Sequence, residues 1–449
     1  MNTNAIIGIS SVCMCLIMAN PTLFNFTVIC MDPPATNGSE NKAIFTRAQE
    51  GIIFSSLAFN FLPATLGTLA LIDNIGLKST FTLFGLMSGI GTLLMPLATN
   101  AFPAVILVRI SQGTPIVVVS VANGAIPHIW GKEGQKNFLV ALLSCVFEIG
   151  PILAMSLSGL CCTSPIGWPG AYYAFGCVTI VSFIAFFLIY PEEKKRSHHE
   201  AESEVAEAVP YRNILTSSSV WGLLLSTVGY AVANHCIEMF GPTYLNSILN
   251  FDVKKTGFLT ALPFFLAIAA KLFAGFLVDR INWISSHLKI VLYIVCAQTS
   301  TIASFILLTI LFSDYSSFAY VLFTTIVTLT RVHVVGILSG CQIVAQQYNH
   351  VVMSLFSAIN AAGALVIPNI VTRITVHKTA SEWTTVFYLI AGVSAATLAL
   401  FLLMTRAEPA KWTNPSAAQI RPDPVKKISD SRPQQTVRLT KYVKLSAQM

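Results

Sequence analysis

Seven ionisable side chains lie inside long apolar stretches of the sequence, where a charge is costly. They are Arg109, Glu148, His235, Glu238, Lys271, Arg331 and His333. An ionisable group at the centre of a bilayer costs several kcal/mol unless it is paired or hydrated, so each is a candidate for ligand binding or proton transfer. The set holds three cations and two carboxylates, which leaves one surplus positive charge while both histidines are neutral. Surplus positive charge in a cavity attracts an anion and disfavours a cation.

Arg109 and Gln112 are the first predicted substrate contacts. Gln112 and Gly113 follow Arg109 by three and four positions, which places all three on one face of a helix. A guanidinium offers a planar fork of donors that fits a carboxylate or a phosphate. The alternative for Arg109 is an internal ion pair with Glu148.

Lys271 and Arg331 complete the predicted substrate-binding set. Lys271 stands among small residues that leave room around its ammonium group, and we expect it to attract an anion or to pair with Glu238. Arg331 and His333 are two positions apart and therefore point to different helix faces. We predict that Arg331 faces the cavity and that His333 packs inside the protein.

Glu148, His235 and Glu238 are predicted to accept and release protons. A carboxylate in an apolar site is protonated more readily than in water, so Glu148 can exchange a proton near neutral pH. His235 and Glu238 are three positions apart on one helix face, a spacing that suits a proton relay. The alternatives are structural pairing for Glu148 and simple packing for His235.

These residues need a membrane-spanning scaffold. The 449 residues are 54% hydrophobic and 10% charged, whereas a typical soluble domain is roughly 25% charged. This composition excludes a soluble enzyme, a disordered chain and a DNA-binding protein. A membrane-spanning helix needs about 20 apolar residues, so we predict an all-α polytopic membrane protein with one helix for each apolar run. Twelve runs are present, near residues 5–31, 47–72, 79–99, 102–129, 137–161, 170–190, 217–248, 256–278, 288–312, 317–345, 350–374 and 383–405.

Charged segments divide the twelve runs into two halves. The predicted domains are an N-terminal six-helix half over 1–190, a cytoplasmic central loop over 191–213, a C-terminal six-helix half over 214–405 and a disordered tail over 406–449. The tail holds nine Lys and Arg against three acids, and such basic segments stay on the cytoplasmic side. Both termini are therefore expected in the cytoplasm. The glycosylation pattern at Asn37 then lies on the opposite side, where we predict a glycan.

The ten cysteines are scattered among the apolar runs and do not form the pattern of a disulfide framework. We expect eight of them, including Cys30, to be small buried hydrophobes. The adjacent pair Cys161-Cys162 is expected near a loop on the non-cytoplasmic side, and neighbouring cysteines bridge each other poorly. The sequence contains no zinc-protease, nucleophile-elbow or phosphate-loop motif and no Cys/His metal spacing. We therefore expect no enzyme activity, no resident cofactor and no metal site.

Equivalent motifs stand in the two halves. Asp73, Gly76 and Lys78 follow the second apolar run, and Gly275, Asp279 and Arg280 close the eighth. The first set resembles the loop signature of the major facilitator superfamily, in which it forms gate and packing elements rather than substrate ligands. The resemblance implies two six-helix halves related by a pseudo-repeat, with a substrate site between them at the midplane of the membrane.

Several further stretches are similar, in order and spacing, to one family of that superfamily. They include Arg109 to Gly113, Val209 to Ser217, Thr260 to Pro263 and Trp383 to Tyr388. They resemble the anion:cation symporters, solute carrier family seventeen, which comprises phosphate carriers, sialin-like lysosomal acid exporters and vesicular glutamate or nucleotide transporters. The resemblance implies a small anionic substrate, coupling to H⁺ or Na⁺, and a plasma, lysosomal or vesicular membrane.

The predicted function is secondary active transport of a small organic or inorganic anion by alternating access, with Arg109 and Arg331 holding the anion from opposite halves. The transport unit is expected to be a monomer without a nucleic-acid partner. Leu23 stands where the family has an arginine, if Asn25 is the family's asparagine, and Ile116 stands where the family has an acidic residue. These departures leave open a second hypothesis, in which a membrane sensor or scaffold keeps the fold but no longer transports.

Overall fold

The computed structural model describes residues 3–31, 44–130, 136–191, 209–280, 284–310 and 316–413. The chain divides into two compact units, Met1–Thr413 and Asn414–Met449, and all described residues lie in the first. Most of the predicted central loop, the basic tail beyond Thr413 and the glycosylation pattern at Asn37 lie outside the described residues. Every regular element in the described ranges is a helix, as predicted from the apolar runs.

The first half contains α1 to α7. Their bounds are α1 Thr3–Thr27, α2 Arg47–Ser55, α3 Phe61–Ala98, α4 Phe102–Trp130, α5 Lys136–Ser144, α6 Val146–Cys162 and α7 Gly167–Ile189. The predicted run 47–72 is a broken helix, because a turn over residues 56–60 separates α2 from the start of α3. Gly76 interrupts α3 with a φ of 81°, which glycine adopts without strain, so α3 contains parts of two crossings.

The second half contains α8 to α14. Their bounds are α8 Tyr211–Leu215, α9 Ser218–Ser247, α10 Val253–Arg280, α11 Ser286–Ile310, α12 Ser316–Ala345, α13 Asn349–Ile374 and α14 Ala380–Met404. A single 3-10 turn over Gln346–Tyr348 joins α12 to α13. Capping boxes fix the starts of α2 and α14, where Thr46 bonds with Gln49 and Thr379 with Glu382.

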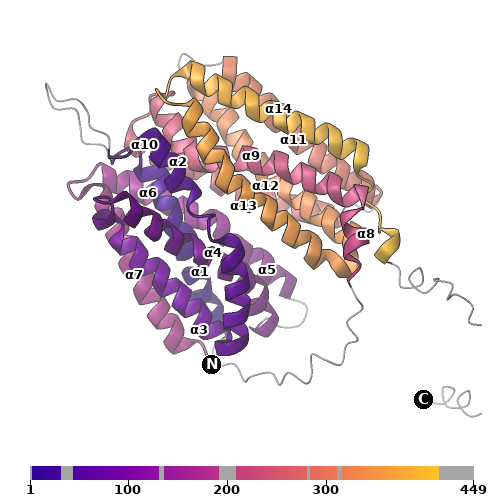
Figure 1. Ribbon diagram of the computed structural model, residues 1–449, viewed down its shortest axis with the longest axis horizontal. Coiled ribbons are helices and arrows are strands. Elements are labelled where there is room, and N and C mark those ends of the chain that lie inside the picture. Colours follow the sequence, from indigo (N-terminus) through magenta and orange to yellow (C-terminus); the bar gives the residue numbers. More distant parts are fainter. Residues whose placement is uncertain are drawn as a thin grey trace, which may run out of the picture. The chain divides into compact units, whose positions relative to one another are not determined.

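The helices account for the twelve predicted crossings. Ten helical segments in the described chain are long and apolar enough to cross a membrane. One of the ten, Ser316–Ile374, contains both α12 and α13. The broken helix formed by α2 and the first part of α3 supplies the remaining crossing. In Figure 1 most helices of the first half gather on one side and most of the second half on the other, and α10 of the second half lies beside α6.

The two ends of the bundle differ in how the halves meet. We call them the disulfide end, where α1 finishes near Cys30, and the termini end, where α1 begins and α14 finishes. Buried apolar side chains form three clusters. One lies toward the disulfide end and joins both halves, for example through Phe54 of α2 and Phe240 of α9, whose ring centroids are 4.8 Å apart. The other two extend to the termini end, and each belongs to a single half. The halves are therefore closed together at the disulfide end.

Small residues allow close packing between the halves at this end. α6 and α10 approach each other at Gly159 and Gly257, where a Cβ added to Gly159 would lie 3.1 Å from the Cα of Gly257. Toward the termini end, a Cβ added at Gly8 or Gly67 would have no heavy atom within 4 Å. Gly159 and Gly257 therefore allow the two halves to approach closely at the disulfide end.

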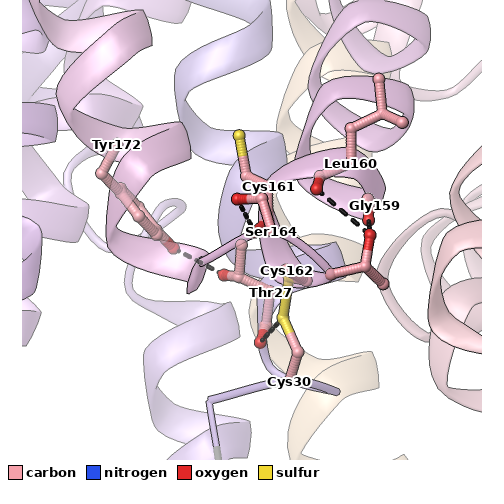
Figure 2. Close-up of a disulfide and its surroundings, with 9 residues drawn as sticks. Thr27, Cys30, Gly159, Leu160, Cys161, Cys162, Ser164 and Tyr172 are labelled. Carbon is pink, nitrogen blue, oxygen red and sulfur yellow. Dashed lines mark hydrogen bonds between the residues drawn. A yellow bond between two sulfur atoms is a disulfide. The ribbon is translucent and has the colours of Figure 1, made fainter. Parts of the chain in front are cut away.

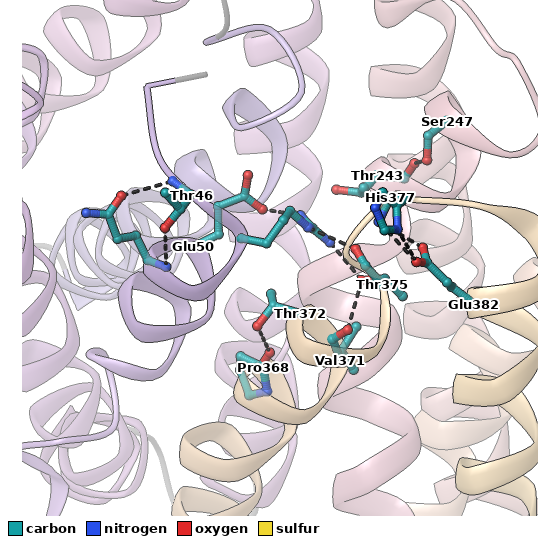
Figure 3. A network of polar contacts seen from close by, with 12 residues as sticks. Thr46, Glu50, Thr243, Ser247, Pro368, Val371, Thr372, Thr375, His377 and Glu382 are labelled. Atoms are coloured by element: carbon teal, nitrogen blue, oxygen red, sulfur yellow. Dashed lines mark hydrogen bonds and ion pairs between the residues drawn. The ribbon is translucent and has the colours of Figure 1, made fainter. Parts of the chain in front are cut away.

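A polar latch also ties α2 to α13 at the disulfide end. Arg47 is ion-paired with Glu50 on the next turn of α2. Its guanidinium donates to the Thr375 carbonyl oxygen at 3.1 Å and to the Thr375 hydroxyl at 2.8 Å (Figure 3). Thr375 follows the last residue of α13, where the helix leaves carbonyl groups without internal partners, so a cation is favoured there.

A disulfide joins Cys30 to Cys162, so the prediction that Cys30 is a free buried thiol is wrong. The two cysteines are 132 positions apart, and only the packing of α1 against α6 brings them together (Figure 2). Nearby, the Thr27 hydroxyl and the Tyr172 hydroxyl are hydrogen-bonded at 2.9 Å, which adds α7 to the same junction. Cys161 remains a free thiol.

Breaking this disulfide is expected to lower the thermal stability of the protein. A cross-link of this kind restricts the unfolded chain and typically stabilises a protein by about 2–4 kcal/mol. We expect Cys30→Ser to lower the melting temperature in detergent and to make the protein insensitive to reductant. Cys161→Ser is the matched control, because it removes the neighbouring thiol and keeps the bond. A wild-type melting temperature unchanged by reductant, with Cys30 and Cys162 both reacting with maleimide beforehand, would contradict the disulfide.

Candidate substrate site

An ion pair joins the two halves inside the bundle. Lys271 of α10 donates to the Glu148 carboxylate of α6 at 2.8 Å and to the Ser144 carbonyl oxygen at 3.2 Å. The Lys271 side chain is 15% exposed and that of Glu148 is 3% exposed. Two predicted alternatives, Arg109 with Glu148 and Lys271 with Glu238, are therefore wrong. The reason is the direct packing of α10 against α6, which no sequence pattern within one half could reveal.

A second ion pair lies within the second half. Arg331 of α12 is 3.4 Å from the Glu238 carboxylate of α9, and Asn234 donates to the same carboxylate oxygen at 3.0 Å. The guanidinium also lies 5.6 Å from the centre of the Phe264 ring. Its Nε atom is buried without a partner among the described residues, so Arg331 retains a free donor.

A narrow internal gap, too small in this conformation to hold a water molecule, surrounds this pair. Its lining residues are Asn234, Ile237, Glu238, Phe264, Val327, Thr330 and Arg331. Asn25 of α1 reaches this region from the first half and donates to the Glu238 backbone oxygen at 3.5 Å. Lys271, Glu148, Arg331 and Glu238 thus bring charged groups from both halves into the interior, as the predicted midplane site requires.

Arg109 is fully buried within the first half. It donates to the Pro21 carbonyl of α1 at 2.7 Å, to the Ile53 carbonyl of α2 at 3.4 Å and to the Gln112 side chain at 3.1 Å. Gln112 in turn donates to the Thr92 hydroxyl at 3.0 Å. The structure therefore brings Arg109 and Gln112 together as predicted, but their partners all belong to the first half. In this conformation Arg109 ties helices together, and its contact with an anion stays a prediction.

The two interior histidines are held by neutral partners. Nε2 of His235 is 3.0 Å from the Asn360 carbonyl oxygen of α13, whereas Glu238 bonds to α12 and to its own helix. A direct His235–Glu238 relay is therefore not formed in this conformation. His333 is buried, with Nε2 2.9 Å from the Ser226 hydroxyl and its ring edge-on to Tyr230. The prediction that His333 packs inside the protein is confirmed.

A larger cavity of about 540 Å³ lies at the termini end of the second half. Its walls come from the start of α11, the end of α12 and the segment after α14, and include His287, Gln342 and Glu408. It contains none of the predicted substrate or coupling residues. The charged interior is therefore the better candidate for substrate.

The sequence model of the Major Facilitator Superfamily matches residues 6–368. The chain belongs to this superfamily. It is similar to sodium-dependent phosphate transport protein 1 of Mus musculus, with 23% identity over 89% of this chain and 92% of the relative. Sialin of Homo sapiens is 23% identical over 81% of this chain and 76% of the relative. Vesicular glutamate transporter 3 of Danio rerio is 21% identical over 81% of this chain and 65% of the relative. The resemblance to anion carriers of solute carrier family seventeen is confirmed.

Solved structures of the superfamily share the fold. An inward-facing, unoccupied bacterial homologue of the human lysosomal transporter Spinster has a TM-score of 0.69 at 12% identity, over 90% of this chain and 97% of that one. A mutant of the nucleoside transporter NupG has a TM-score of 0.70 at 16% identity, over 90% of this chain and 100% of that one. At these identities the likeness extends to the fold alone, and it confirms the predicted major facilitator architecture.

The superfamily loop signature lies at the turn that Gly76 makes inside α3. Lys78 packs its ammonium 4.6 Å from the centre of the Phe187 ring of α7, and Asp73 is exposed. The equivalent residues of the second half, Gly275, Asp279 and Arg280, occupy the end of α10, and their side chains are outside the description. The geometry of the first set fits packing between helices, and the gate role of both sets stays a prediction.

The sequence interpretation missed several polar partners in this interior. Asn25 and Asn234 are not among the predicted site residues, yet they donate to the backbone oxygen and to the carboxylate of Glu238. The signal was present, because an amide within an apolar run needs a partner. Asn234 finds its partner on its own helix, whereas Asn25 finds one on a helix of the other half.

Proposed function

We propose that this protein of the Major Facilitator Superfamily is a secondary active transporter of small anions that works by alternating access. The observation that supports it most directly is the Lys271–Glu148 pair, which links the two halves within the bundle. The buried interior charges are three cations and two carboxylates, and both carboxylates already have a cationic partner. A site of this kind accommodates an anion at lower cost than a cation.

The conformation supports one stage of that cycle. The halves share a core at the disulfide end, and their clusters are separate toward the termini end. In the proposed cycle the Arg47 latch and the Gly159–Gly257 contact separate when the disulfide end opens. Rocking of the two halves around the charged interior then exposes the site to each side of the membrane in turn.

We place the disulfide end in the lumen or outside the cell, and both termini in the cytoplasm. Disulfides persist in oxidising compartments and are rare in the cytosol. The basic tail calls for the same orientation through the positive-inside rule. A glycan on Asn37, which follows Cys30 by seven positions, belongs to this topology and is part of the proposal.

Reconstituted transport tests the proposed function. The names of relatives suggest phosphate and glutamate as substrates, and the resemblance to sialin-like acid exporters adds sialic acid. Each is supplied to proteoliposomes with an inward H⁺ or Na⁺ gradient. We expect gradient-driven uptake of at least one of them, and at least a tenfold loss in Lys271→Gln. Lys255→Gln is the matched control, because Lys255 is an exposed lysine at the other end of α10. Properly folded wild-type protein that moves none of these anions would favour the sensor or scaffold hypothesis instead.

A further inference from the structure

Lys271 is the interior cation best placed to exchange partners. Its ammonium contacts the Glu148 carboxylate at 2.8 Å and the Ser144 carbonyl at 3.2 Å, and both partners belong to the opposite half. Arg109, by contrast, bonds to backbone and amide partners inside the first half, although its Nη2 atom has no partner among the described residues. Arg331 is paired with a carboxylate of its own half. Among the described residues, the Lys271–Glu148 pair is therefore the one interior ion pair that must break when the halves move apart there.

The surroundings of Glu148 leave little room for another negative charge. Glu148 is 3% exposed, and its own helix contributes Cys145 and the α10 helix contributes Lys271. Cys15 of α1 is close enough to Cys145 to interact with it electrostatically, and Glu148 interacts in the same way with Tyr230 of α9 and Arg331 of α12. Glu238 lies beyond Arg331 and is already paired with it. An anion added to the intact Lys271–Glu148 pair would place two negative charges around one ammonium in a poorly solvated site, which is strongly unfavourable.

We propose that Glu148 and the anionic substrate bind Lys271 alternately, so that one proton must bind Glu148 for each anion that binds the ammonium. The proposal rests on the proposed transport function and specifies its coupling. In the loading step, the Glu148 carboxylate takes up H⁺ and becomes a neutral acid, and the anion takes its place beside Lys271. The site contains one positive and one negative charge before and after the exchange. Release reverses the step, so one H⁺ and one anionic charge cross together.

The position of the pair between the halves gives the exchange a second consequence. Deprotonated Glu148 holds α6 to α10 through Lys271, and the bound anion replaces that link with a contact on the second half alone. Two forms of the carrier therefore have no uncompensated charge beside Lys271. One is the empty carrier with deprotonated Glu148, and the other is the loaded carrier with protonated Glu148. A carrier that has taken up only one of the two partners leaves a charge uncompensated, which disfavours its passage through the cycle.

The test compares net uptake with exchange in proteoliposomes that contain the full chain. The probe is whichever of phosphate, glutamate and sialic acid the wild-type protein transports. In wild-type protein we expect the apparent KM of net uptake to rise tenfold per pH unit at alkaline pH, since one proton is taken up per anion. Glu148→Gln is a permanent mimic of the neutral acid. We expect it to lose accumulation driven by a pH gradient at least tenfold, and to retain pH-independent exchange of labelled for unlabelled anion.

Controls separate this proposal from the proposed function and from misfolding. Glu408→Gln removes an exposed carboxylate after α14 and is expected to keep the wild-type pH profile. If Glu148→Gln does not fold, Glu148→Asp keeps a titrating carboxylate and is expected to keep a tenfold slope per pH unit. Wild-type flux that is Na⁺-driven and independent of pH, or a Glu148→Gln variant that still accumulates anion from a pH gradient, would overturn the exchange on Lys271 and leave transport itself intact. A wild-type protein without flux overturns both.

Discussion

Replacing Gly257 with leucine is expected to abolish transport and to hold the protein open at its disulfide end. A Cβ at Gly257 would lie 2.9 Å from the Met155 carbonyl oxygen and 3.0 Å from the Cα of Gly159. Both atoms belong to the backbone of α6, so they cannot turn away as a flexible side chain would. Overpacking of this kind costs about 1–3 kcal/mol even where side chains can adjust. A bias of that size shifts a two-state equilibrium by about 5- to 150-fold.

Flux and cysteine accessibility measure this effect together. Ser55 is fully buried where α2 meets α13, and it donates to the Leu365 carbonyl at 2.8 Å. In the Gly257→Leu protein we expect Ser55→Cys to react with a membrane-impermeant thiol reagent applied to the disulfide side, and flux to fall at least tenfold. Gly392→Leu in α14 is the matched control, because no heavy atom lies within 4 Å of its added Cβ. Normal flux with Ser55→Cys still protected would show that this end does not need glycine to close.

Replacing Arg109 with glutamine is expected to destabilise the first half before it affects anion binding. The guanidinium is fully buried and satisfies carbonyl groups of Pro21 and Ile53 on two other helices. Ile53 lies in the last turn of α2, whose helix breaks off two residues later, so a cation near its end is favoured. Leaving a buried acceptor unsatisfied costs about 1–3 kcal/mol. Lysine is not an adequate substitute, since one ammonium cannot reproduce the planar fork of donors.

The melting temperature and the yield of monodisperse protein in detergent check this expectation. Arg331→Gln is the comparison, because it also removes a buried guanidinium but affects the charged space between α9 and α12. We expect Arg109→Gln to lose more thermal stability than Arg331→Gln, and Arg331→Gln to lose flux while it remains folded. An Arg109→Gln protein with the wild-type melting temperature and a weaker anion affinity alone would instead support the predicted substrate contact.

The membrane architecture was predictable because each helix is encoded by its own residues. A run of about 20 apolar residues must form a helix in lipid, since every backbone donor and acceptor has to be satisfied within the segment. Breaks in those helices were less predictable. The turn over residues 56–60 falls inside the predicted run 47–72, and the guanidinium of Arg109, from a different helix, bonds to the Ile53 carbonyl just before it.

The candidate site also contains features that the sequence predicted and features that it did not. Which residues carry charge in the interior followed from their positions in apolar runs, and Lys271, Glu148, Arg331 and Glu238 do meet inside the bundle as ion pairs. Their pairing did not follow, because it depends on which helices are neighbours. The sequence correctly indicated that Glu148 pairs with a cation. That cation is Lys271 of α10 and not Arg109 of α4, as one alternative had it.

By itself, then, the sequence determined the membrane-spanning class, the two halves and the surplus of cations, since each depends on composition and local spacing. The tertiary structure alone decided that Lys271 faces Glu148, that Arg109 ties α1, α2 and α4, and that Cys30 is bonded to Cys162. The physical reason is that these are contacts between residues tens to more than a hundred positions apart, created when helices pack. No periodicity within one helix carries information about the face of another.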